Sequence, residues 1–440
     1  MALTIFTDCS GHALTLTVQI GLCTTTSGYA TFNTAVFNTA TWGPDEVWTD
    51  VSAYVRKITT SRQFDQNFRS WTAGTFTVRL SNTDGRFSPD NLTGPFAPGG
   101  ITQIIPGRPV KITLAYAGVT YPVIFGYANV WTEGWENTYG PRTGDAYMEI
   151  SGSDEWQRIS RPTGMATASA GAGETFGPRL QRILSYIGFT RTTDIDVGTI
   201  PLQPTDLSTK PVEEIATTAA SEGGSVWVGA DGTLIGRRRY ALVEDPRSVN
   251  IQAVYGDGGA GEIPWEDIDV SPLSADNVIN SATYTAVGGL PQSAQDASSI
   301  ALYGEIGDQA SWSSSLICQN DSDVAVLAAW TVQLNKDPTA KVNSITLKPR
   351  ASAVALIPTI LGATIRDLIE IRRRPPSATS HTLIRDCFIS GIAVTVESGD
   401  IDVVLSLSPA STYRIYAGSH FDSALFGASD IDPAGARFFI

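Results

Sequence analysis

The sequence predicts a mainly β protein with a small mixed α/β insertion, and three observations support this fold class. Thr, Ser, Gly and Val are frequent while Lys and Glu are scarce, which favours strands and turns over long surface helices. Apolar and polar residues alternate along several short stretches, as in half-buried strands. Apolar residues at helical spacing are confined to a few segments, so the helices are expected to be few.

The length of 440 residues suggests about two to four domains. From the changes in pattern we expect five segments: an N-terminal strand and arm (1–47), a first β-rich unit (48–160), an α/β insertion (161–245), a second β-rich domain with one helix (246–410) and a C-terminal tail (411–440).

The first strand is expected at 14–20, where Leu14, Leu16, Val18 and Ile20 alternate with polar residues. Phe76, Val78 and Leu80 predict a second strand in the same way, and 147–150 reads as another. An aromatic segment at 29–42 is echoed at 420–427, and both are expected to be docking anchors. Trp131, Trp135 and Trp156 are expected in core packing or at an interface rim rather than stacked on a sugar.

A linker is expected at 166–173, after which the period becomes helical. A helix is predicted at 176–187, and a second at 210–222 with Thr209 as N-cap and Pro211 in the first turn. Asp231-Gly232 predicts the turn of a hairpin over 225–235. The remaining expected elements are a helix at 322–335, strands at 277–285, 342–347, 365–372, 383–395 and 401–407, and a hairpin turn at 397–400.

The net charge of −14 argues against a protein that grips nucleic acid, because such affinity comes largely from phosphate contacts. An acidic wall would still let DNA slide past without sticking. The acidity also fits simple solubility, which charge alone favours.

The two dense basic patches are the runs Arg237, Arg238, Arg239 and Arg372, Arg373, Arg374. One interpretation is contact with nucleic acid, with acidic subunits or with a lumen. The other is that they are solvated or paired within the fold. The overall acidity favours the second interpretation or a subunit-facing role.

Cysteine usage and the N-terminus narrow the class of protein further. The four cysteines are scattered with no CxxC pair, so zinc sites and a disulfide framework are not expected and free buried thiols are. The first residues lack a secretory signal pattern, and no apolar run approaches the roughly 20 residues that span a membrane. We therefore expect synthesis in a cytoplasm.

The motifs of several enzyme classes are absent from the sequence. The three histidines form no HExxH pattern, and neither a G-x-S-x-G elbow nor a phosphate-binding P-loop is present. The Asn82-x-Asp84-Gly85 stretch reads as a tight turn rather than a calcium loop, which would need a bidentate acid at its end. A dispersed Ser/His/Asp triad or a carboxylate pair that cleaves glycosides stays open. We expect no enzyme, cofactor or metal.

Several stretches of the chain carry a family resemblance. They are 49–55, with Thr49-Asp50-Val51-Ser52; 74–89, ending in Asp84-Gly85-Arg86-Phe87-Ser88-Pro89; Pro106-Gly107-Arg108-Pro109-Val110; Phe125-Gly126; the hairpin at 225–235; and 296–304, with Ser-Ile-x-x-Tyr-Gly. These sequence motifs resemble those of minor tail proteins, or baseplate hubs, of long-tailed siphovirus-type bacteriophages, closest to those infecting actinobacteria. The resemblance covers roughly 48–407 and is weaker in the last third.

The resemblance implies hub-type β-barrel domains and a structural role at the tail tip of the virion. A homotrimer would form a pseudo-sixfold ring that meets the distal tail or tail tube protein above and other minor tail or receptor-binding proteins below. Its lumen would hold the tape-measure protein and later pass DNA without specific binding, during host cell attachment and DNA ejection. Trp48, Phe87, Phe125 and Trp131 are then expected in the hub barrel core or its seam.

Two alternatives stay open. One is a distal tail ring protein, which is structural but hexameric. The other is a tail-borne glycan-binding protein or hydrolase that uses the tryptophans and scattered acids. Because the chain stops soon after residue 407, we do not expect it to carry a hydrolase extension.

Overall fold

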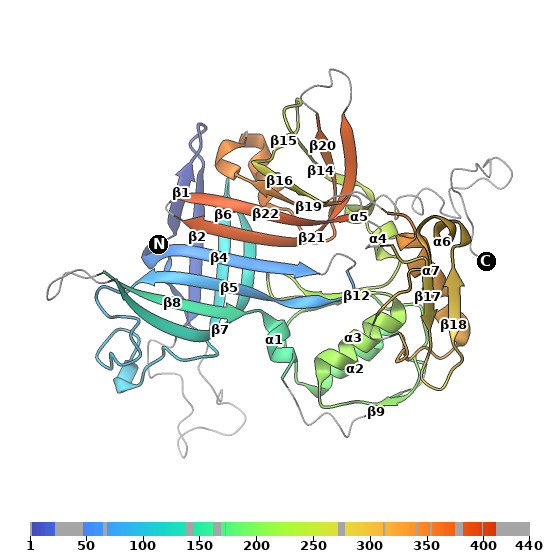
Figure 1. The fold of residues 1–440 in the computed structure, drawn as a ribbon. Helices are drawn as coiled ribbons and strands as arrows, with labels where there is room; N and C mark the ends of the chain where they lie inside the picture. Colours follow the sequence, from blue (N-terminus) through green and yellow to red (C-terminus); the bar gives the residue numbers. More distant parts are fainter. Residues whose placement is uncertain are drawn as a thin grey trace, which may run out of the picture.

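The computed structural model describes residues 2–22, 47–64, 68–136, 145–161, 169–171, 173–271, 278–310, 313–338, 341–352, 354–374, 382–397 and 399–410. The predicted aromatic anchors at 29–42 and 420–427 and the predicted tail at 411–440 lie outside these residues, as do residues 166–168 and 172 of the predicted linker. Among the described residues the fold is mainly β, as the sequence predicts (Figure 1).

One large curled sheet dominates the molecule. Its main path has the order β1-β2-β6-β7-β8-β5-β4-β21-β20-β14-β15, and β3, β16, β19 and β22 pair off this path. Its strands are β1 (Leu3–Thr7), β2 (Ala13–Gly21), β3 (Trp48–Asp50), β4 (Val55–Phe64), β5 (Trp71–Ser81), β6 (Pro109–Tyr116), β7 (Val119–Glu136), β8 (Asp145–Ser153), β14 (Ile251–Gly256), β15 (Ile263–Pro264), β16 (Asp267–Val270), β19 (Val342–Leu347), β20 (Leu368–Arg373), β21 (Leu383–Glu397) and β22 (Asp400–Pro409).

Strand β2 shows why these residues form the sheet. Its apolar residues are buried at every second position while the threonines between them are partly exposed. Leu16 faces Leu114 and Val18 faces Ile112 across the antiparallel pair with β6, so the two alternations coincide. A shift of one residue would turn both apolar sets to solvent, and the register is therefore strongly specified.

The two β-rich halves of the chain meet where β4 pairs with β21. The antiparallel register runs from Gly391 opposite Gln63 to Glu397 opposite Lys57. A Cβ at Gly391 would lie 2.5 Å from the Cβ of Gln63, so the close approach of the two strands requires glycine there. The pairing of β21 with β22 is bulged at the same glycine.

The continuous sheet crosses the segment boundaries expected from the sequence. Strands β1 and β2, which fall in the expected N-terminal arm, pair within the sheet through β6. Strand β21, from the expected second β-rich domain, pairs with β4 of the first. The division into independent domains stays a prediction.

The α/β insertion lies beside the lower edge of the sheet in Figure 1. It contains α1 (Glu155–Ile159), α2 (Phe176–Tyr186), α3 (Pro211–Glu222), β9 (Ser169–Ala170), β10 (Thr193–Ile195), β11 (Thr205–Asp206), β12 (Ser225–Val228) and β13 (Leu234–Arg237). The β12–β13 hairpin turns at Gly232, whose φ is 88°, as its Asp-Gly sequence predicts. The hairpin and helices α2 and α3 agree with prediction.

The predicted N-cap of α3 is wrong. The cap is Lys210 rather than Thr209, with no side-chain hydrogen bond to the helix, and Pro211 is the first helical residue. The Glu214 side chain instead accepts a hydrogen bond from the Ser208 N–H at 2.8 Å. This contact ties the incoming chain to the first turn in the manner of one half of a capping box.

A second, smaller core lies beyond the insertion, at the right of Figure 1. Strands β17 (Ser281–Tyr284) and β18 (Gln292–Gln295) form a hairpin that packs against α7 (Asp321–Asn335), with α6 (Ala297–Tyr303) beside it. The remaining short elements are α4 (Ala241–Glu244), α5 (Pro246–Val249), α8 (Ile357–Leu361) and 3-10 turns at Ser52–Tyr54, Pro98–Gly100, Pro349–Ala351 and Val354–Leu356. Helix α7 confirms the prediction at 322–335.

Candidate functional site

Two of the predicted hub residues, Phe87 and Phe125, are core residues. Phe87 is fully buried, with Tyr54 edge-on at a centroid distance of 5.5 Å and Phe96 stacked at 5.4 Å. The Asn82 side chain accepts the Phe87 N–H at 2.9 Å, and Gly85 has a φ of 67°. The Asn82–Gly85 stretch is thus a tight turn that orients Phe87 inward.

Phe125 of β7 is buried between aromatic rings and a cation. Its ring is edge-on to Trp48 at 6.2 Å, and the guanidinium of Arg191 lies 3.5 Å from its centroid. Trp48 is half-buried, with the Lys111 ammonium 4.5 Å from its centroid. Such cation–π contacts favour a fixed geometry at the edge of the core.

Trp131 is half-buried and its indole N–H donates to the Ile105 carbonyl at 3.0 Å. Trp156 is buried in the main core, whereas Trp135 is 71% exposed. The three tryptophans therefore do not form one cluster. Trp156 serves the core, and Trp135 is an apolar side chain presented to solvent near the end of β7.

The first arginine run is largely paired within the fold. Arg237 Nη1 lies 3.1 Å from Asp194 Oδ1 and 3.6 Å from Asp196 Oδ1. The hydrogen bond from Arg237 holds the pKa of Asp194 below its usual value. Arg238 pairs with Glu244 at 2.5 Å.

The second run is paired around one buried carboxylate. The Glu262 side chain is only 2% exposed, and it meets Arg372 at 3.4 Å and Arg374 at 2.5 Å. These hydrogen bonds, with that from Arg374 first, lower the pKa of Glu262 to about 2. Arg373, the last residue of β20, is exposed. Internal pairing therefore accounts for four of the six arginines, and Glu262, which the sequence did not single out, organises two of them.

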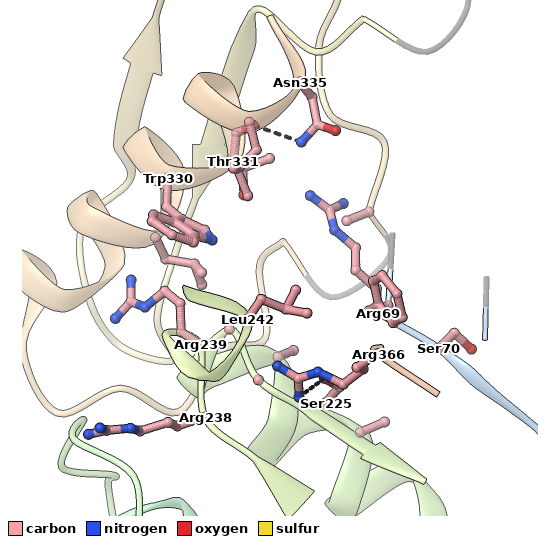
Figure 2. Close-up of a pocket in the computed structure, with 18 residues that line it drawn as sticks. Arg69, Ser70, Ser225, Arg238, Arg239, Leu242, Trp330, Thr331, Asn335 and Arg366 are labelled. Carbon is pink, nitrogen blue, oxygen red and sulfur yellow. Dashed lines mark hydrogen bonds between the residues drawn. The ribbon is translucent and has the colours of Figure 1, made fainter. Parts of the chain in front are cut away.

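Arg239 differs from the other five because it is 5% exposed and lines a cavity of about 450 Å³. Figure 2 shows this cavity between α7, which carries Trp330, the chain before β5, which carries Arg69, and the chain that follows β13. Arg238 and Arg366 also line it, and no Asp or Glu is among its lining residues. Sequence reasoning found Arg238 and Arg239 but not their convergence with Arg69 and Arg366 from two other segments.

A second cavity of about 420 Å³ carries both signs of charge. Asp231 and Asp367 line it together with Arg62 and Arg247, and Trp227 provides an apolar wall. The Asp367 side chain, 2% exposed, takes hydrogen bonds from Arg247 at 2.6 and 2.5 Å. Its charges are thus largely satisfied inside the protein.

Asp154 is a buried carboxyl at the joint between the sheet and the insertion. It is 1% exposed and accepts N–H groups of Gly74 at 2.8 Å and Trp156 at 3.0 Å. Burial raises its pKa to about 7, and burial lowers the pKa of Arg62 nearby to about 10. The residue caps α1 and ties it to β5, which is a structural role.

Within the described ranges, no group of three or more His, Cys, Asp or Glu side chains is arranged to hold a metal ion. Among the same residues, no helix combines the length and apolar character needed to cross a membrane. Cys318 and Cys387 are buried free thiols as predicted, but Cys9 is exposed.

Solved structures of other proteins share this architecture. No family model matches the chain, and no curated protein matches it. Two solved structures match nearly end to end. The 43 kDa tail protein of prophage MuSo2 from Shewanella oneidensis has a TM-score of 0.52 at 14% identity, covering 90% of this chain and 97% of its own. A tail protein from Neisseria meningitidis MC58 has a TM-score of 0.54 at 11% identity, covering 91% and 98%.

The chain has the fold of these tail proteins. The likeness runs through both β-rich halves and the insertion, because it covers about nine-tenths of the chain. At 11–14% identity it establishes the arrangement of the backbone, and residue roles have to come from the contacts described above.

Proposed function

We propose that the chain is a structural protein of a bacteriophage tail and forms the hub ring at the tail tip. The observation that carries the proposal is the fold itself, shared over nearly their whole length with two tail proteins, one of them from a prophage. The motif resemblance over residues 48–89 and 106–126 supports the same family independently, because it rests on short sequence motifs rather than on the fold. Because a fold alone does not determine function, the proposal rests on the shared fold together with the motif resemblance.

A trimeric ring suits the architecture. The two β-rich halves of each chain are joined into one sheet at β4 and β21, so three copies would supply six sheet regions around an axis. Such a ring would match a sixfold tube on one face and a threefold tip on the other. Ring contacts would also cover exposed strand edges, which otherwise invite aggregation.

The charge distribution fits a conduit. The net charge is −14, and four of the six clustered arginines are paired inside the fold. These paired arginines would therefore offer little to the phosphates of DNA, and DNA could pass without arrest. In this proposal the tape-measure protein occupies the lumen first, the tube or distal tail protein sits above, and receptor-binding or other minor tail proteins sit below.

We place part of the ring contact at the end of β7. Trp135 is 71% exposed there, and Ile105, whose carbonyl accepts the indole N–H of Trp131 on the same face of β7, is 41% exposed. Exposed aromatic side chains with apolar neighbours are typical of interface centres. This strand also belongs to the segment that carries the family resemblance.

The test is the mass of the purified chain in solution by native mass spectrometry, with and without the variant Trp135→Ser. We expect a trimer that the variant weakens at least tenfold in dissociation constant, the scale of an interface hot spot. Leu302→Ser is the matched control, because Leu302 is 73% exposed but lies in α6. It should leave the trimer unchanged.

Other outcomes would replace the proposal. A stable hexamer would move the chain to the distal tail ring. A monomer at every concentration that cleaves or binds bacterial wall polysaccharide would make it a glycan-binding protein or hydrolase. A trimer that both variants leave intact would keep the ring and remove β7 from its contact.

A further inference from the structure

The cavity beneath α7 is built from parts of the chain that are distant in sequence. Phe68, Arg69 and Ser70 precede β5, the segment 223–225 joins α3 to β12, and Trp330 to Asn335 belong to α7. Figure 2 shows Arg69, Arg239 and Arg366 entering from different elements, with Trp330 above Arg239. A molecule bound here would contact the sheet, the insertion and the small α7 unit together.

The lining carries an unusual excess of positive charge for so acidic a chain. Arg69, Arg238, Arg239 and Arg366 line the cavity and no carboxylate does. Two of them have ion-pair partners at its margin: Arg69 meets Asp308 at 3.0 Å and Arg238 meets Glu244 at 2.5 Å. The remaining lining is largely apolar or small, with Leu242, Leu327, Leu334 and three alanines.

Arg239 is the key residue, because two of its three guanidinium nitrogens are buried without a hydrogen-bonded acceptor among the described residues. It is 5% exposed, and these two atoms are Nε and Nη1. Its Cζ lies 5.2 Å from the centroid of the Tyr240 ring. Glu222 interacts with its charge, but the Glu222 oxygens accept N–H groups of Thr199 and Ile200 at 3.1–3.2 Å. Burying guanidinium nitrogens without acceptors costs free energy.

Arg366, a second buried arginine of this cavity, has an unusual backbone conformation. Its φ is +74°, in the left-handed region that non-glycine residues seldom adopt, and it is 5% exposed. Its Nη1 lies 3.4 Å from Ser225 Oγ, the dashed contact in Figure 2. Strained backbone persists where the surroundings hold it and is concentrated at functional sites.

We propose that this cavity binds a small organic oxyanion, with its charged group toward Arg239 and Arg366 and its apolar part against Trp330 and the leucines. A planar guanidinium presents a fork of donors that matches phosphate and carboxylate oxygens. The volume of about 450 Å³ is in the range of small-molecule sites. Binding supplies the counter-charge that the lining lacks. The inference does not depend on the proposed place in a tail.

The experiment is isothermal titration calorimetry of the full chain with inorganic phosphate and with phenyl phosphate, at ionic strength matched with chloride. We expect saturable binding of both, and tighter binding of phenyl phosphate because its ring buries apolar surface. Arg239→Met should weaken both by about tenfold or more, the usual loss for a charged hydrogen bond. Trp330→Leu should weaken phenyl phosphate alone.

Arg373→Met is the matched control, since it removes one positive charge from an exposed arginine outside the cavity. It should bind both probes as the wild type does. Arg239→Lys keeps the charge but loses the fork, and it replaces Arg239→Met if circular dichroism shows that the latter does not fold. Absence of saturable heat for both probes, or equal affinity in a folded Arg239 variant, overturns the proposal.

Discussion

The two arginine triplets have the same sequence and opposite environments. At 372–374 the first and third side chains share one acceptor, the buried Glu262, and the middle one faces solvent. At 237–239 the first two reach acids at the surface, and the third is buried in a cavity without an acceptor. Adjacent arginines in one run can thus have different environments, because the tertiary fold decides which of them lies near an acid.

The difference also separates stability from binding. The Glu262 cluster is satisfied within the chain, so it contributes to the fold. Two guanidinium nitrogens of Arg239 have no acceptor within the described part of the chain, so hydrogen bonding inside the fold does not account for their burial. Substitutions of Arg374 and of Arg239 should therefore differ in their effect on stability.

The largest effect should come from Glu262→Gln. The change leaves Arg372 and Arg374 without their shared carboxylate, in a site where Glu262 is 2% exposed. Loss of a buried charged partner costs about 3 kcal/mol. Urea unfolding at pH 7 measures it, with Glu213→Gln as control because the Glu213 side chain is 62% exposed. A loss no larger than that of the control would contradict the assigned role.

Acid titration should report the same carboxylate. Because Arg374 lowers the pKa of Glu262 to about 2, its contribution is complete above the unfolded-state pKa near 4.5 and is lost as the pH falls from there toward 2. The gap in unfolding free energy between wild type and Glu262→Gln should therefore narrow as the pH drops from 6 to 3. A gap that stays constant over this range would mean that the ionised carboxylate is not what stabilises the site.

The same substitution in each run should shift stability in opposite directions. In chloride buffer Arg374→Met should lower the unfolding free energy by about 1 kcal/mol, because it removes contacts to Asp257 and Glu262. Arg239→Met should raise it or leave it unchanged, because it removes a buried charge. Losses of equal size would show that Arg239 is satisfied in the folded chain.

The smallest effect should come from Arg373→Met. Arg373 is exposed at the end of β20, and such surface changes usually stay within about 0.5 kcal/mol. Thermal unfolding checks this against Arg374→Met. A larger loss would mean that Arg373 is covered, for example by another subunit.

Much of the fold could be predicted because it follows local patterns. The alternation in β2, the helical spacing in α2 and α7, and the Asp-Gly turn of the β12–β13 hairpin all predicted the right element at nearly the right residues. The short helix α1 was missed because its five residues carry no full apolar period. The β4–β21 pairing was missed because it joins residues more than 300 positions apart.

Less of the candidate site could be predicted. The sequence marked Arg239 as one of three like charges, and nothing local distinguishes it from Arg238. The convergence of Arg69, Arg239 and Arg366 depends on the tertiary fold, which brings three distant segments of the chain together. The left-handed backbone at Arg366 could not be predicted either, because no glycine marks this position. Phe87 is the favourable contrast, since the turn chemistry just before it places it in the core.

The most direct test of the proposed function is cryo-electron microscopy of the particle that carries this chain, with the chain located by its large sheet. The proposal predicts three copies in a ring around a central channel at the tail tip, below the sixfold tube. Six copies in the ring above the tip, or absence of the chain from the particle, would contradict it.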